Sequence, residues 1–200
     1  PVMFYYLNGT ITLLDANLAV VDCGGVGYAC HTTNYTLARL QLGKPAKLFT
    51  YCNIKEDAFD IFGFFTREEL NCFERLLGVT GVGPKAALSI LSEMTPEGVA
   101  MAAASGDSKK FTKASGVGPK LAQRIVLELK DRVKKMGFTG GTLELTGTDD
   151  AGIVSASQNA EQAVQALIVL GYTQSEAAQA VAKLDGSLST EELIRGALKS

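Results

Sequence analysis

The sequence predicts an α+β protein made of several small domains, and three observations support that prediction. The first 65 residues contain short strand-like segments separated by turn signals. A five-residue loop flanked by helical periodicity then occurs twice within residues 66–137. A Gly-, Thr- and Ser-rich stretch separates that block from a last periodic segment. We therefore expect domains at 1–65, 66–137 and 159–200, with a flexible linker at 138–158.

The N-terminal domain is predicted to be a small barrel. Its strand-like segments are rich in β-branched and aromatic residues, and Gly, Asn, Asp and Pro separate them. Five short strands in about 60 residues suit a closed barrel, of which the OB-fold is the commonest of that size. The predicted strands are residues 4–14, 18–21, 26–31, 46–52 and 59–65.

The middle domain is organised around a repeated loop. The sequence Gly-Val-Gly-Pro-Lys at 81–85 returns unchanged at 116–120, 35 residues later. The register continues beyond the loop, so one structural unit is used twice. The further matching pairs are Ala87 and Ala122, Ile90 and Ile125, and Glu93 and Glu128.

Each unit reads as helix, tight turn, helix. Glycine permits positive φ and close approach of a backbone, and Pro84 suits the first position of a helix. Apolar residues at helical spacing precede the first loop and follow both. The turn leaves N–H groups at the start of the second helix free for an anion. Lys85 and Lys120 would add positive charge beside them.

Other glycine loops are less consistent with this sequence. Gly81-x-Gly83-x-x-Ala86 imitates a dinucleotide fingerprint, but that motif needs a preceding strand, and here a helix is predicted. A Walker A loop ends in Gly-Lys-Ser/Thr, whereas Pro84 follows Gly83. A plain αα-hairpin with no ligand remains open for either copy alone. Duplication argues against it, because packing gives no reason to keep both Pro and Lys.

The pattern resembles the helix-hairpin-helix motif, which holds DNA phosphates through turn amides without reading bases. Paired copies would hold both strands across one groove. The predicted DNA-binding residues are Gly81, Val82, Gly83, Lys85, Gly116, Val117, Gly118, Lys120 and Arg124.

Charge is distributed unevenly along the chain, although the net charge is only −2. Residues 66–137 carry 12 basic and 8 acidic residues, a balance of +4, whereas 138–200 carry 3 and 8, a balance of −5. A basic run is usually a solvated helical face. Next to a phosphate-binding loop, a DNA-facing surface is the better interpretation.

Composition limits the other possibilities. A chain that is 46% hydrophobic and 20% charged is typical of a globular protein, and no apolar run approaches 18 residues. The four cysteines show no CxxC spacing and His31 is the only histidine. We therefore expect a reduced cytoplasmic protein with no metal, no cofactor and no membrane partner.

Acidic residues lie between the last two predicted strands. Glu56 and Asp57, with Asp60 close behind, invite a metal-nuclease interpretation. Two neighbouring acids at a hairpin tip are more often a solvated turn. No further acidic pair or catalytic histidine is nearby, so no catalytic residue is predicted.

The C-terminal segment regains helical periodicity and predicts three helices. Leu167 and Leu170 mark the first, which Gly171 ends, and Ser175 is the predicted N-cap of the second. The turn from Leu170 to Tyr172 resembles that of ubiquitin-associated domains. With little basic charge, this module suits protein binding, and Leu167, Leu170 and Tyr172 are its candidate contacts. A role in the core is the alternative for each of them.

Together these features resemble the RuvA family, Holliday-junction-binding subunits of the bacterial branch-migration complex, and the resemblance covers the whole chain. Besides both loops, the specific segments are 7–11 (Leu-Asn-Gly-Thr-Ile), 24–28 (Gly-Gly-Val-Gly-Tyr), 55–58 (Lys-Glu-Asp-Ala), 62–64 (Phe-Gly-Phe) and 128–131 (Glu-Leu-Lys-Asp).

The resemblance implies a non-catalytic, four-way-junction-binding protein acting in recombination and repair. It further implies a homotetramer, or an octamer on DNA, with barrels at the centre and hairpin units along the DNA arms. Glu56 and Asp57 correspond to the family's acidic pin, which repels phosphates where strands cross. The tethered helices would recruit the RuvB ATPase motor, and RuvC resolvase is a further expected partner.

Two rival functions stay open at this point. A helix-hairpin-helix nuclease or glycosylase would need a catalytic acid cluster or a lysine–aspartate pair, which the sequence does not offer. A general single-strand binder would instead use aromatic stacking on the barrel face.

Overall fold

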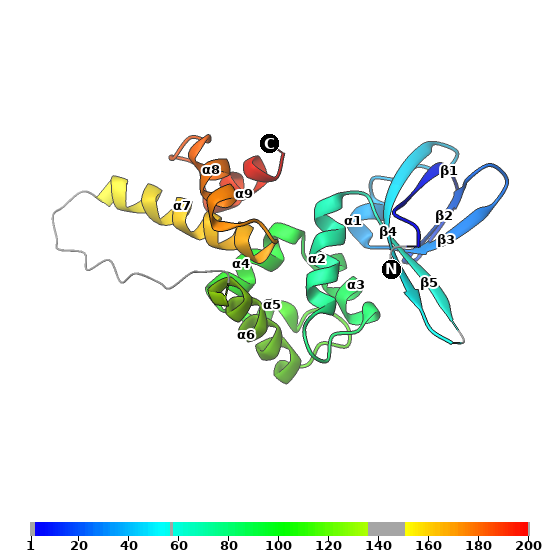
Figure 1. Cartoon of the computed structure of the whole chain (residues 1–200), viewed down its shortest axis with the longest axis horizontal. Helices are drawn as coiled ribbons and strands as arrows, with labels where there is room; N and C mark the ends of the chain where they lie inside the picture. Colours follow the sequence, from blue (N-terminus) through cyan, green and yellow to red (C-terminus); the bar gives the residue numbers. More distant parts are fainter. Residues whose placement is uncertain (1–2, 57, 136–150, 200) are drawn as a thin grey trace. The chain divides into compact units, whose positions relative to one another are not determined.

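A computed structural model describes residues 3–56, 58–135 and 151–199 (Figure 1). The N-terminal strands form a closed barrel in the order β1-β2-β3-β5-β4. Neighbouring strands are antiparallel except β3 and β5, which pair in parallel. The predicted OB-type barrel is confirmed. Its strands are β1 (Tyr6–Asp15), β2 (Leu18–Asp22), β3 (Gly27–His31), β4 (Pro45–Ile54) and β5 (Phe59–Phe64).

The barrel core is filled by alternate residues of its strands, as the period of two requires. Leu7, Ile11, Val21 and Leu48 are buried members of one apolar cluster. Gly9 of β1 permits a close approach to β2, because a Cβ there would overlap the carbonyl group of Asp22. A register shift between Ile11 and Leu13 bends β1 within its pairing with β2.

A short helix that the sequence analysis did not anticipate, α1 (Asn34–Leu37), follows β3. Thr33 caps it by accepting a hydrogen bond from the Thr36 N–H at 3.1 Å. The Thr36 hydroxyl accepts from the Phe65 N–H and donates to Glu69 at 2.6 Å. These bonds tie the end of the barrel to the helix that follows it.

The first helical hairpin consists of α2 (Arg67–Leu77) and α3 (Pro84–Glu93). Thr66 caps α2 by accepting from the Glu69 N–H. Phe73 of α2 is fully buried against the barrel, with ring centroids 4.9 Å from Phe64 and 5.2 Å from Phe62. Aromatic packing therefore attaches this hairpin to the barrel.

The second hairpin is built from α4 (Pro96–Ser105), α5 (Ser108–Phe111) and α6 (Pro119–Lys135). Its interior contains small residues of α4 together with larger side chains of α5 and α6. The buried residues include Val99, Ala103, Phe111, Ile125 and Leu129.

The C-terminal part contains α7 (Ala151–Val169), α8 (Gln174–Ala182) and α9 (Thr190–Lys199), which confirms three helices. Residues 151–158, placed in the linker by the sequence analysis, are helical, and 136–150 lie outside the described residues. The predicted N-cap Ser175 was wrong. Thr173 caps α8 instead, because it lies three residues before Glu176. At this spacing the two residues form a reciprocal capping box, in which each side chain accepts a hydrogen bond from the other residue's backbone N–H.

The chain divides into two compact units. One contains residues 1–78, 82–95 and 114–116, and the other contains 79–81, 96–113 and 117–200. The predicted domain at 66–137 is thus divided between them. Across the described residues, every helix is too short or too polar for a transmembrane span.

Candidate nucleic-acid interface

The first repeated loop ends in a helix start whose amides are uncapped. Gly81 has φ of 92°, and Gly83 is the extended N-cap residue of α3, with Pro84 at the first helical position. The first intrahelical bond runs from the Ala87 N–H to the Gly83 carbonyl group at 3.0 Å. The N–H groups of Lys85 and the next residue precede that bond, and no side chain of the described residues caps them. This arrangement suits an anion.

The second loop repeats the same local geometry. Gly116 has φ of 80°, and α6 begins at Pro119. The Ala122 N–H donates to the Gly118 carbonyl group at 2.9 Å, as Ala87 does to Gly83 in the first copy. The sequence repeat is therefore also a repeat of backbone conformation.

The two glycines within each loop have different reasons to be glycine. Gly81 and Gly116 adopt positive φ, which other residues rarely adopt. Gly83 and Gly118 do not, and a Cβ at either position would meet no atom of the described residues within 4 Å. Conformation fixes the first glycine, and the open space at the third loop position leaves room for a ligand's backbone to approach.

The remaining predicted DNA-binding residues fall into two groups. Val82 and Val117 are 6% and 5% exposed, so their side chains pack inside and only their backbone groups are available. Lys85 and Lys120 are exposed one position into their helices. Their ammonium groups are free to reach a phosphate beside the helix start.

Arg124 contacts Thr80, the residue that precedes the first loop. Its Nη1 atom is 3.5 Å from the Thr80 carbonyl oxygen, and Glu128 of the same helix accepts from the Thr80 N–H at 3.1 Å. Side chains of helix α6 thus contact both the N–H and the carbonyl group of Thr80. The sequence analysis missed this anchoring, although Thr80 and Ser115 are hydroxyl residues at the repeat offset of 35.

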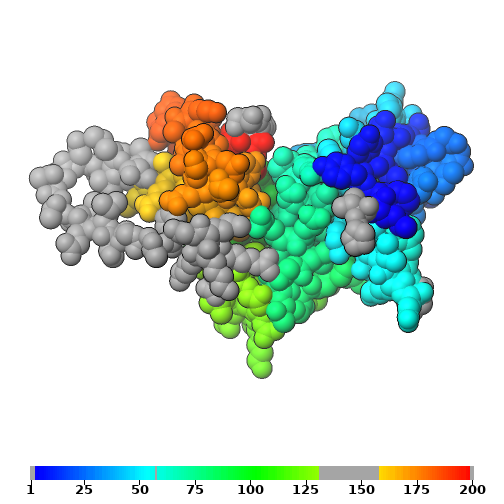
Figure 2. Space-filling view, in the orientation of Figure 1, coloured from blue at the N-terminus to red at the C-terminus, as the bar shows by residue number. Residues whose placement is uncertain are grey.

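The β4–β5 hairpin projects from the barrel (Figure 2). Glu56 at its tip is exposed, and the Lys55 N–H donates to the Ala58 carbonyl group at 2.8 Å to close the turn. Asp57, the second predicted pin residue, lies outside the described residues. Asp60 is held separately, by Asn53 at 3.4 Å and by His31 at 4.0 Å. Among the described residues, no three His, Cys, Asp or Glu side chains are placed to hold a metal ion.

Two buried groups of the first unit have altered proton affinity. Burial raises the pKa of Glu69, although the Thr36 hydrogen bond and nearby Arg39 oppose the shift. Burial also raises the pKa of the Cys30 thiol to about 12, with smaller contributions from Cys23 and Cys52. Both groups are buried in the first unit, and neither is part of the repeated loops.

The predicted partner-binding residues lie around the turn after α7. Leu167 and Leu170 are 0% and 5% exposed, so they belong to the core, which is the alternative the sequence analysis kept open. Tyr172 is half-buried, and Gly171 adopts φ of 107° between them. Of the three, Tyr172 is the one with accessible surface.

Family comparisons match the chain in three successive segments. Residues 3–63 match the RuvA N terminal domain, 73–131 the SAM-like helix-hairpin-helix tandem, and 158–200 the RuvA C-terminal domain. These segments correspond to the barrel, the two hairpins and the three C-terminal helices.

Curated relatives are similar over nearly their whole length. A protein of Acetivibrio thermocellus is 40% identical over 201 residues, covering 98% of each chain. One from Ruminiclostridium cellulolyticum is 40% identical, covering 99% of this chain and all of the relative. One from Paramagnetospirillum magneticum is 43% identical over 98% of this chain and 96% of the relative. Each is named Holliday junction branch migration complex subunit RuvA.

Proposed function

This chain belongs to the RuvA family, and on that premise we propose that it binds four-way DNA junctions as a subunit of a branch-migration complex. One observation carries the proposal: two identical loops each lead into a helix whose first N–H groups precede the hydrogen-bond ladder, with an exposed lysine beside them. Helix starts of this kind bind phosphate oxygens through backbone amides.

Phosphate contacts explain binding but not selectivity, because every DNA backbone offers the same groups. Selectivity for a junction would come from geometry. Several copies of the loop pair, held in a fixed arrangement, engage several DNA arms at once, and each added arm raises the effective concentration for the next. A linear duplex offers no such arrangement of arms.

A homotetramer, or an octamer on DNA, supplies those copies. The barrel exposes large apolar side chains, which supports an interface with further copies. Copies joined by their barrels would gather the hairpin tips, and the carboxylates of Glu56 and Asp57 would then repel phosphates at the crossing point. The exposed apolar residues include Tyr5, Tyr6, Leu42, Ile54 and Phe59.

The chain itself hydrolyses nothing in this proposal. The C-terminal helices recruit the RuvB motor, which supplies the work of ATP hydrolysis, and the RuvC resolvase acts on the same junction. The acidic balance of residues 138–200 supports a protein partner rather than DNA for this part.

The test is a titration of a four-way junction and of a linear duplex with the same arm sequences, read by gel shift, together with the protein's mass in solution. We expect preferential junction binding and the mass of a tetramer or its multiple. A monomer that binds both DNAs equally would overturn the proposal.

Two further experiments distinguish the proposed function from its rivals. Incubation of the protein alone with labelled junction and Mg²⁺ leaves the DNA intact if the protein is not a nuclease. Excess single-stranded DNA fails to displace the junction if the barrel is not a general single-strand site.

A further inference from the structure

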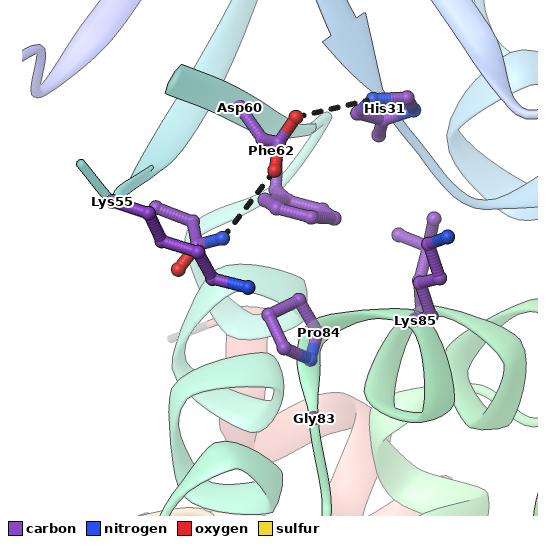
Figure 3. Close-up of a pocket in the computed structure, with 9 residues that line it drawn as sticks. His31, Lys55, Asp60, Phe62, Gly83, Pro84 and Lys85 are labelled. Carbon is purple, nitrogen blue, oxygen red and sulfur yellow. Dashed lines mark hydrogen bonds and ion pairs between the residues drawn. The ribbon is translucent and has the colours of Figure 1, made fainter. Parts of the chain in front are cut away.

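We propose that a cavity beside the first loop binds one unpaired nucleotide of the DNA. The cavity has a volume of about 330 Å³ and lies between the barrel surface and the start of α3 (Figure 3). The volume is at the lower end of the range for small-molecule sites, about 300–1,000 Å³. The inference rests on the proposed junction binding, because it assigns that DNA a second contact next to the loop.

The lining suits a nucleobase. The rings of His31 and Phe62 lie together, with centroids 5.5 Å apart, and both line the cavity. Phe62 is buried beneath, whereas half of the His31 side chain is exposed and offers a ring face to a base. Base–aromatic stacking of this kind tolerates any sequence.

A polar edge stands next to the rings. Asp60 accepts a hydrogen bond from Asn53 at 3.4 Å and lies 4.0 Å from the His31 Nε2 atom. A carboxylate held in this way can accept a hydrogen bond from an exocyclic amino group, such as that of cytosine. Asn53 also lines the cavity and provides amide groups beside it.

Two lysines give the cavity a place for phosphate. Lys55 comes from the β4–β5 hairpin and Lys85 from α3, and they lie on opposite sides of the Phe62 ring in Figure 3. Both side chains line the cavity, and Asp60 provides the carboxylate among the described residues of its lining. Two ammonium groups against that carboxylate leave a positive balance, so an anion is favoured.

The position of the cavity explains why its ligand would be unpaired. It includes Gly83 of the first loop and Lys55, the neighbour of Glu56 at the hairpin tip. A strand held at the loop and deflected by the acidic tip passes this cavity. A base within a duplex has its faces covered by its neighbours, so only an unstacked base could lie on His31.

The first test uses the whole protein and needs no junction. His31 is the chain's only histidine, so its imidazole proton resonances report on the cavity without ambiguity. Titration with 2′-deoxycytidine 5′-monophosphate should shift them saturably, and inorganic phosphate should not reproduce the shift. Lys55→Ala should weaken the effect, whereas Lys183→Ala, the same charge change at an exposed position of the C-terminal helices, should not. No saturable shift, or an identical shift with phosphate alone, overturns the proposal.

The second test uses junctions with one unpaired deoxycytidine at the branch point, with an abasic residue there, or fully paired. We expect the unpaired base to increase affinity roughly tenfold. His31→Ala and Lys55→Ala should remove that gain, and Lys183→Ala should keep it. An equal gain with the abasic residue would show a phosphate contact without a base and would overturn the proposal. Failure to bind any junction would instead count against the proposed function. The first test uses no junction, so its result would still decide whether the cavity binds a nucleotide.

Discussion

At the scale of single residues, we expect the first glycine of each loop to be needed for folding and the second to be needed for binding. Gly81→Ala should destabilise the protein by about 1–3 kcal/mol, because φ of 92° is strained for alanine. Gly83→Ala should change stability by less than about 0.5 kcal/mol, since its backbone is ordinary and its surroundings are open. Its methyl group would nevertheless occupy the space beside the amides and weaken junction binding, by about 1.5–3 kcal/mol for one charge-assisted bond.

Denaturant unfolding and junction titration of both variants check this prediction. Gly116→Ala and Gly118→Ala provide the matched pair in the second loop. Normal junction binding by Gly83→Ala would show that the first loop does not contact phosphate.

The loop lysines should act as simple phosphate contacts. Lys85→Ala and Lys120→Ala should each weaken binding to junction and duplex alike, and should reduce the salt slope of the affinity by roughly 0.9 for each phosphate that is no longer neutralised. A gel-shift salt series measures the slope. Lys183→Ala is the control, and slopes equal to the wild type's in all three variants would remove these lysines from the DNA surface.

Glu69 makes stability depend on pH. Because its folded pKa is raised above the ordinary 4.5, the folded state keeps a proton that the unfolded state loses. Its contribution to stability is therefore complete below about pH 4.5 and is lost as pH rises through the folded pKa. Glu69→Gln cannot ionise and should lack this decline, so its stability should match or exceed the wild type's at pH 7–8.

Urea unfolding between pH 4 and pH 8 measures the difference. Glu69 is buried, but its ion-pair partner Arg39, at 3.7 Å, is half-exposed, so solvent screens the pair and its removal in the variant costs little. A variant that is less stable than the wild type at pH 8 but equal at pH 4 would contradict the argument, because it would show that the charged form is the stabilised one.

At the scale of elements, the sequence predicted what local chemistry decides. Alternating β-branched residues and turn signals located all five strands, and the repeat located both loops. Helix α1 was missed because four residues with a threonine cap carry no periodic signal. Residues 151–158 were taken as linker because Gly, Ser and Ala at the start of α7 do not distinguish a helix from a tether.

The cavity could not be predicted from the sequence. His31, the hairpin residues Lys55 and Asp60, and Lys85 come from three separate parts of the chain, and only barrel closure with the packing of α2 brings these parts together. The role of α6 is similar: Glu128 contacts Thr80 across 48 residues. Long-range placement of this kind depends on tertiary packing, which a single sequence does not reveal.

The β4–β5 hairpin should set how DNA passes through the complex. Glu56→Lys should retain or increase DNA affinity, because it replaces a repulsive charge with an attractive one, and should reduce discrimination between junction and duplex. Glu161→Lys, the same change at an exposed position of α7, is the control. Competition titrations measure the ratio of junction affinity to duplex affinity. An unchanged preference for junctions would disprove a steering role for Glu56.

At the scale of the whole molecule, the uneven distribution of charge indicates that different parts of the chain bind different partners. Residues 66–137 carry the basic balance of +4 and both loops, whereas 138–200 carry −5 and three helices. An acidic module gains little from DNA and is repelled by it, so it suits contact with a second protein. Binding of DNA and recruitment of a motor should therefore be separable by truncation.

A chain ending at residue 150 tests this separation. The cut belongs there because α7 begins at Ala151, and a cut at 158 would leave part of that helix. We expect junction affinity within about threefold of the wild type's, since the loops are retained, and complete loss of motor-dependent branch migration. Circular dichroism controls for folding, and the separate 151–200 fragment should inhibit migration by the intact protein through competition for the motor. Migration that persists with the truncated chain would place the motor contact on the barrel or the hairpins.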